Sequence, residues 1–122
     1  MIVKRKKDHK VKQSPYCGEL QEILSGSEYS PNIAIALDIC PTKAHYHSGF
    51  DEIYFVIDGY LVLKLFTPEL GEITEQGLSA NELCVIPKGI HHKVSEASVS
   101  NRLCIITMPC FADDDEHLSD VF

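Results

Sequence analysis

The sequence predicts an all-β fold, a closed β-sandwich or barrel of about eight or more strands. Short runs rich in β-branched and aromatic residues recur along the whole chain. Glycine and proline lie between these runs, where turns are expected. Helical spacing is almost absent. Only residues 18–24 place leucine and isoleucine three and four positions apart, and a short strand fits that run equally well.

The first half of the chain contains the clearest strand patterns. Residues 33–39 alternate isoleucine and leucine with smaller or polar residues, the period of a strand with one buried face. Residues 44–47 form a second, short strand before the apolar run 52–58. Asp58-Gly59 is a strong hairpin signal, so residues 60–66 are predicted to return beside residues 52–58.

The second half contains weaker strands separated by turns. Pro68 to Gly71 and Pro87 to Gly89 are turn sequences. The expected strands of this half are residues 72–76, 82–86, 91–95 and 103–108.

The length of 122 residues indicates one domain. We expect a basic, flexible N-terminal arm at 1–15, a barrel at 16–110 and a frayed acidic tail at 111–122. No run approaches 18 apolar residues and no apolar stretch follows the first charges, so we expect neither a membrane span nor a secretory signal.

Charge is distributed unevenly. Residues 1–12 contain six of the 11 basic residues and one acid, and the remainder of the chain has a net charge of −12. Such an acidic body repels nucleic acids and anionic membranes, so neither is an expected partner. The basic arm lacks interleaved aromatic residues and is interpreted as solvated.

The five cysteines are odd in number and show no Cys-x-x-Cys spacing. Cys40, Cys84 and Cys104 lie in apolar, strand-like runs. We therefore expect buried, reduced thiols in a cytoplasmic protein.

Metal-ligand chemistry is the strongest functional signal. His45 and His47 are two residues apart, so a strand directs both side chains to the same face. Glu52 follows after four residues, and His91-His92 lies about forty residues downstream. Three imidazoles and one carboxylate suit a divalent transition metal, and these ligands alone do not distinguish Fe, Mn, Ni, Cu and Zn.

These residues also resemble a family signature. His-x-His, four residues, Glu, six residues and Gly, from His45 to Gly59, is similar to the first cupin motif, and Pro87 to His92 is similar to the second. Ile39 replaces a usual glycine, and the second motif lacks its first glycine and last asparagine. The resemblance, over residues 33–108, implies a double-stranded β-helix, the jelly-roll cupin barrel.

The resemblance also implies a ligand set. It selects His45, His47, Glu52 and His92 as metal ligands, and strand alternation then turns His91 away. Tyr54 and Val56 share the strand face of Glu52 and are candidate substrate-pocket residues.

Alternation places Ile53, Phe55 and Ile57 on the opposite, outward face of the same strand. Such an apolar face requires a cover. The chain's own N-terminal segment and a second subunit are both candidates, and the cupin resemblance implies a homodimer.

Three function classes fit this sequence. The first is a metal-dependent enzyme acting on a small molecule, as a dioxygenase, isomerase or lyase. The second is a non-catalytic binder or sensor of a small ligand such as a sugar. The third is a structural protein in which the metal stiffens the barrel. A fold does not select among them, and we slightly favour the enzyme.

Overall fold

The computed structural model describes residues 1–122 and consists of strands, loops and two single-turn 3-10 helices. The helices are η1 (Lys6–Asp8) and η2 (Asp113–Asp115). The strands are β1 (Lys10–Ser14), β2 (Gly18–Leu24), β3 (Asn32–Leu37), β4 (His45–Tyr46), β5 (Asp51–Asp58), β6 (Tyr60–Thr67), β7 (Glu72–Ser79), β8 (Leu83–Ile86), β9 (His91–Ala97), β10 (Arg102–Met108) and β11 (His117–Leu118).

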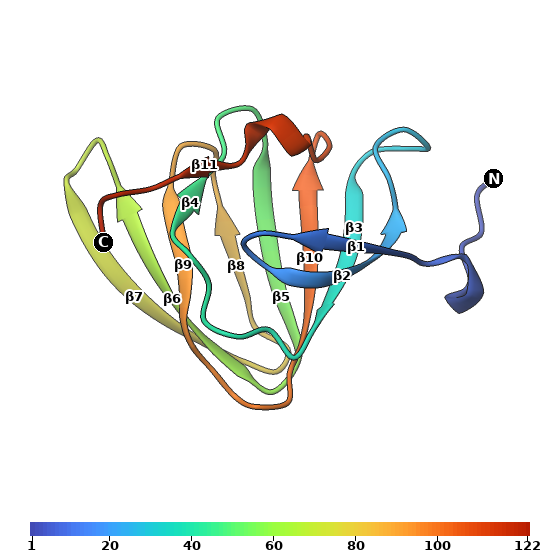
Figure 1. The fold of residues 1–122 in the computed structure, drawn as a ribbon, viewed down its shortest axis with the longest axis horizontal. Coiled ribbons are helices and arrows are strands. Elements are labelled where there is room, and N and C mark those ends of the chain that lie inside the picture. The colour runs from blue at the N-terminus through green and yellow to red at the C-terminus, as the bar shows by residue number, and fades with distance from the viewer.

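The strands form two antiparallel sheets that enclose the interior (Figure 1). One sheet has six strands in the order β1-β2-β3-β10-β5-β8, and the other has five in the order β11-β4-β9-β6-β7. This arrangement confirms the predicted all-β fold with its jelly-roll architecture. No helix of the structure is long and apolar enough to cross a bilayer.

Apolar side chains fill one part of the interior. Leu61 and Leu63 of β6 are fully buried between the sheets, and Val56 of β5 and Leu103 of β10 meet them from the other sheet. Each burial of this kind contributes about 1.5–3 kcal/mol to stability. These residues alternate with more exposed neighbours along each strand, as the period of two predicts.

Polar side chains occupy the other part of the interior. On β5, β10 and β3, pairing sets Thr107 opposite both Glu52 and Asn32, and all three residues are buried. On the other sheet, His45 of β4 is paired with His92 of β9. Strands β5 and β10 therefore supply side chains both to the apolar core and to a buried polar layer.

The predicted hairpin at Asp58-Gly59 is wrong. β5 pairs with β10 and β8, whereas β6 pairs with β9 and β7, so this turn carries the chain from one sheet to the other. Gly59 has φ +79°, and a Cβ there would lie 2.5 Å from the Ser100 carbonyl oxygen. A glycine is required at this position because the backbone near Ser100 approaches it so closely. Asp-Gly is typical of hairpin turns, and this dipeptide alone could not distinguish a hairpin from a turn that connects the two sheets.

Both chain ends are more ordered in secondary structure than the sequence indicated. Lys10–Ser14, assigned above to the flexible arm, forms β1 and pairs with β2, which settles the open choice for residues 18–24 in favour of a strand. Only the residues before β1 extend away from the sheets (Figure 1). The C-terminal segment forms η2 and then β11, which pairs with β4. Figure 1 shows this segment crossing one end of the barrel.

The outer face of the six-stranded sheet is apolar over four strands. Ile33, Ile106, Ile53 and Val85 are paired across β3, β10, β5 and β8. A parallel row contains Ile35, Cys104, Phe55 and Leu83. Val85 and Leu83 are exposed, and the β5 residues of both rows are half-buried. The N-terminal hairpin, formed by β1 and β2, continues this sheet beyond β3. It therefore lies beside the apolar rows in the plane of the sheet.

No disulfide forms among the five cysteines, and the expectation that three of them are buried is wrong. Cys40 is exposed, because its run ends at Pro41 in the loop before β4. Cys104 is half-buried because β10 directs it to the outer sheet face, whereas Cys84 points inward from the edge strand β8 and is half-buried against the core.

Candidate metal centre

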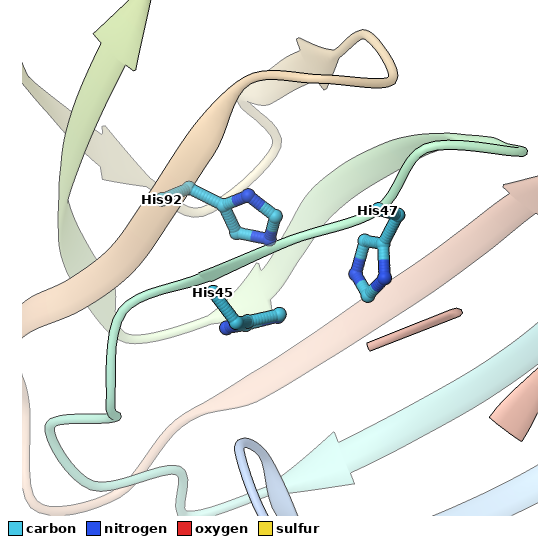
Figure 2. Close-up of side chains that lie close together, drawn as sticks. All are labelled: His45, His47 and His92. Carbon is cyan, nitrogen blue, oxygen red and sulfur yellow. The ribbon is translucent and has the colours of Figure 1, made fainter. Parts of the chain in front are cut away.

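Three histidine rings converge at the polar end of the interior. His45 lies on β4, His47 follows it after one residue, and His92 enters from β9 (Figure 2). One ligand atom of each ring lies within 4.8 Å of those of the other two, and all three residues are buried. Tyr46, between His45 and His47, points the other way and stacks on His91 with ring centroids 4.2 Å apart.

A backbone carbonyl fixes the orientation of each ring. Nδ1 lies 3.1 Å from the Lys43 oxygen in His45, 2.7 Å from the Asp115 oxygen in His47, and 3.0 Å from the Ile90 oxygen in His92. A carbonyl oxygen only accepts hydrogen bonds, so Nδ1 carries the proton in each ring. In the neutral imidazole, Nε2 is then left with a free lone pair.

Glu52 completes the cluster from the opposite sheet. Its Oε1 is 2.8 Å from His47 Nε2, and its Oε2 is 3.5 Å from His92 Nε2. The buried atoms His47 Nε2, His92 Nε2 and Glu52 Oε2 have no hydrogen-bond partner of acceptable geometry, despite the short distance between His47 and Glu52. Lone pairs therefore face one another in a buried space, an arrangement that requires a proton or a cation between them.

The electrostatics of the cluster follow from burial and from mutual contact. Burial and the charge of His92 lower the pKa of His45 to about 3. Burial also opposes protonation of His47, but the Glu52 carboxylate outweighs it and raises that pKa. Burial would raise the pKa of Glu52, whereas the two neighbouring imidazoles lower it well below its usual range. The site thus favours an ionised carboxylate and a positive charge beside it.

The residues present fit a divalent transition metal. Nitrogen and oxygen ligands lie about 2.0–2.2 Å from such an ion, and the histidine ligand atoms here lie within 4.8 Å of one another. Ligating histidines usually donate their second nitrogen to a carbonyl or carboxylate, as all three rings do here.

Aromatic rings enclose the cluster. Tyr16 stacks on His45 and Phe50 stacks on His47, each with ring centroids 4.3 Å apart. Both contacts limit the entry of water and restrict rotation of the imidazoles. Neither residue was identified from the sequence, because an aromatic residue in a loop carries no spacing signal.

The C-terminal segment is a second contribution that sequence reasoning missed. Besides its carbonyl contact to His47, Asp115 accepts hydrogen bonds at its carboxylate from the backbone nitrogens of Ser48 and Gly49, at 3.0 and 2.6 Å. The Asp115 carboxylate also accepts the Ser48 hydroxyl at 2.6 Å and lies 2.9 Å from His117 Nε2. These hydrogen bonds lower the pKa of Asp115 well below its usual range even though desolvation opposes the shift. The run of acids in the sequence indicated only a solvated tail.

A small cavity lies beside the cluster, between the N-terminal hairpin, β3, β10 and the C-terminal segment. Glu52 and Thr107 lie in its wall, together with Glu116, which follows Asp115. Burial and the nearby Glu52 raise the pKa of Glu116, although His47 partly offsets this. The candidate pocket residues Tyr54 and Val56 are buried in the core and do not line this cavity.

Cys17 and His91 also lie close to the cluster. Cys17 lines the cavity, and its Sγ is 4.0 Å from Tyr54 Oη. Burial raises the pKa of the Cys17 thiol to about 12. His91 lies on the other side of β9 from His92, where its Nδ1 is 2.6 Å from the Ser119 hydroxyl.

Comparison with known proteins finds likeness in three dimensions only. No family profile and no curated protein matches the sequence. Oxalate decarboxylase from Bacillus subtilis superposes with a TM-score of 0.76 at 12% identity, over 92% of this chain and 30% of that one. A variant of Streptomyces PAC13 with uridine superposes with a TM-score of 0.72 at 14% identity, over 98% of this chain and 90% of that one.

A third similar structure is the capsular polysaccharide assembling protein CapF from Staphylococcus aureus. Its TM-score is 0.69 at 16% identity, over 90% of this chain and 31% of that one. The chain thus spans less than a third of the oxalate decarboxylase and CapF chains but nearly all of PAC13. All three have the cupin fold, and so does this chain, as a small domain with a buried group of three histidines able to bind a metal.

Proposed function

We propose that this chain is a metal-dependent enzyme of the cupin fold that acts on a small molecule. His45, His47, Glu52 and His92 would ligate one divalent transition metal ion. The observation that carries the proposal is the buried approach of Glu52 Oε1 to His47 Nε2 at 2.8 Å without a hydrogen bond. A cation bound by both of these unpaired electron donors would resolve this arrangement.

The donor set suits Fe, Mn, Ni, Cu or Zn. The similarity to an oxalate decarboxylase described with Mn(II) centres supports a metal of this group. When bound, the ion would supply Lewis-acid or redox chemistry at the positions that the four side chains leave open. A dioxygenase, an isomerase or a lyase fits such a centre.

The chain's own residues prepare the site in three ways. The carbonyls of Lys43, Ile90 and Asp115 hold the Nδ1 protons, so each ring presents Nε2. Stacking by Tyr16 and Phe50 excludes water from two of the rings. Glu52 offsets part of the positive charge of an ion, which leaves the remainder to stabilise negative charge on a reacting molecule.

A non-catalytic small-molecule binder or sensor is the second candidate. It is favoured by the similarity over nearly the full length of both chains to a PAC13 variant described with uridine. Both candidates use the same pocket, and turnover distinguishes them.

The first test is elemental analysis of the purified protein, with one bound transition metal per chain expected. Protein loaded with Fe, Mn, Ni or Zn is then incubated with sugars, phenolics and small keto acids. Oxygen uptake and isomerised product report turnover, and calorimetry reports binding. Tight binding of one compound without turnover under any metal favours the sensor over the enzyme.

We also propose that the chain forms a homodimer in the cytoplasm. The apolar rows on the outer face of the six-stranded sheet support a second copy as the cover, because they continue across four strands. Five cysteines without a disulfide fit a reducing compartment.

A further inference from the structure

The wall of the cavity beside the metal cluster contains polar side chains that the ligand set does not use. Thr107 lies between Glu52 and Asn32 in the strand pairing of β5, β10 and β3. It is 3% exposed, and its hydroxyl has no hydrogen-bond partner. A buried hydroxyl without a partner is costly, so this atom is expected to bond to a molecule in the cavity that its residue lines.

Apolar side chains form much of the remaining wall, from Leu20, Ala34, Ile105 and Phe111, and its charged side chains are mostly acidic. Glu22 and Glu116 line the cavity together with Glu52, and Lys12 is the one basic side chain there. The Lys12 ammonium is already 3.3 Å from the Glu22 carboxylate. Asn32 Nδ2 donates to the same carboxylate at 3.0 Å. Carboxylates only accept hydrogen bonds and repel anions, so the wall favours a ligand that brings donors and no negative charge.

The cavity is small and continues toward the surface. Its volume is about 40 Å³, which is room for about three or four groups the size of a water molecule. Lys12, Glu22, Asn32 and Phe111 also line a neighbouring groove, together with Ser25 and Ser27. Lys12 and Phe111 lie between the cavity and the groove, with the Lys12 ammonium 5.9 Å from the centre of the Phe111 ring, so a ligand held at Thr107 would extend outward past this pair.

We infer that this cavity binds an uncharged polyhydroxylated molecule, a polyol or small sugar, and discriminates against its carboxylate counterparts. The inference rests on the proposed function in that the bound molecule is taken as the substrate at the metal centre. Thr107 is the specificity residue at the inner end, where its hydroxyl pairs with a ligand hydroxyl. Glu22 and Glu116 accept from the other hydroxyls and reject a carboxylate.

The test uses full-length protein loaded with Zn(II), which is redox-inactive, and calorimetric titration with matched pairs. Uncharged polyols and sugars of three to six carbons are compared with the corresponding sugar acids. At least one uncharged compound should bind, and its acid should bind at least about tenfold more weakly. Equal or tighter binding of the acids, or no binding by any uncharged compound, overturns the inference.

Substitutions assign the effect to residues. Thr107→Val preserves shape and should weaken polyol binding about tenfold, and Thr107→Ser should retain it. Thr74→Val, on exposed strand β7, is the matched control and should change nothing. Glu22→Gln removes a negative charge from the wall, so it should strengthen binding of the acid relative to that of the polyol. Undiminished polyol binding by Thr107→Val contradicts the assignment.

Metal content separates this inference from the proposed function. If every variant binds zinc normally but no polyol binds, the inference fails and the metal centre stands. If the protein binds no metal, the proposed function fails, and the same titrations of metal-free protein still measure whether polyols bind and whether Thr107 is required.

Discussion

The Nδ1 of His47 donates to the backbone carbonyl of Asp115 at 2.7 Å, although 68 residues separate the two in sequence. The Asp115 carboxylate in turn binds the backbone of Ser48 and Gly49, immediately after His47. The end of the chain is thereby attached to a candidate ligand of the metal at both its backbone and its side chain.

Removal of the Asp115 carboxylate should weaken metal binding. Asp115→Ala loses the bonds to Ser48 and Gly49 that hold its carbonyl against His47, and we expect metal affinity to fall about tenfold, as for losses of groups that orient metal ligands. Calorimetric titration with Zn(II) measures this. Asp114→Ala changes an exposed neighbour in η2 and is the control. Equal affinities of the two variants would argue against this role for Asp115.

Removal of one candidate ligand should have a larger effect. His47→Ala should lower metal affinity by at least about 10–100-fold, because a lost ligand costs no less than a lost orienting group. His91→Ala removes an imidazole on the far side of β9 and should leave affinity nearly unchanged. The same titration measures both variants. Similar losses in both would show that the wrong histidine was chosen.

The metal-free protein should lose stability on acidification. The pKa of His45 falls from 6.5 in the unfolded chain to about 3 in the folded protein, so the unfolded state binds the proton first. The lowered pKa of Glu52 acts in the same direction, whereas the raised pKa of His47 opposes it. The free energy of unfolding should therefore decrease between about pH 6.5 and pH 3, by a few kcal/mol in total.

Urea unfolding of chelator-treated protein at several pH values measures this dependence. His45→Asn removes the buried imidazole and should flatten the profile over that interval. A wild-type free energy of unfolding that is constant from pH 6.5 to pH 4 would contradict the prediction.

The apolar part of the interior should dominate stability. Leu63 is fully buried, and Leu63→Ala should lower the free energy of unfolding by about 2–5 kcal/mol. Leu70 is 68% exposed, so Leu70→Ala should change it by no more than about 0.5 kcal/mol. Chemical denaturation at neutral pH compares the two. A small loss for Leu63→Ala would place the stabilising core elsewhere.

The proposed homodimer can be tested by a substitution on the outer face of the six-stranded sheet. Light scattering should give twice the chain mass at micromolar concentration, and Val85→Lys should shift the mass toward the monomer. Val85 is 52% exposed in the single chain, and Ile73, 49% exposed on β7, provides the control Ile73→Lys. A wild-type monomer would leave the apolar rows without the proposed cover.

The sequence predicted the fold class because alternation and turn residues act locally, and most strands lie where these patterns indicate. It also identified the convergent group of His45, His47, Glu52 and His92, because strand period and motif spacing are properties of short segments. The choice of strand partner was not local. Asp58-Gly59 has hairpin chemistry, yet crossing between the sheets depends on the distant Ser100 that approaches Gly59.

The surroundings of the site were harder to predict for a related reason. Asp115, Thr107 and Glu22 reach the site from different strands and segments, and none has a fixed spacing to the histidines. Aspartates near a chain end usually remain solvated, so composition favoured the wrong description of residues 111–122. The pairing of β11 with β4 and the hydrogen bonds of Asp115 to Ser48 and Gly49 bring the carboxylates of this segment beside the histidine cluster.

The interior is divided lengthwise, with Leu61, Leu63, Val56 and Leu103 in one part and His45, His92, Glu52 and Thr107 in the other. Substitutions that alter the chemistry of one part therefore leave the packing of the other in place. During evolution, the reactive side chains of the polar part can therefore be replaced one by one while the apolar part keeps the domain folded. That independence is one physical reason why proteins of such different sequence can retain this architecture.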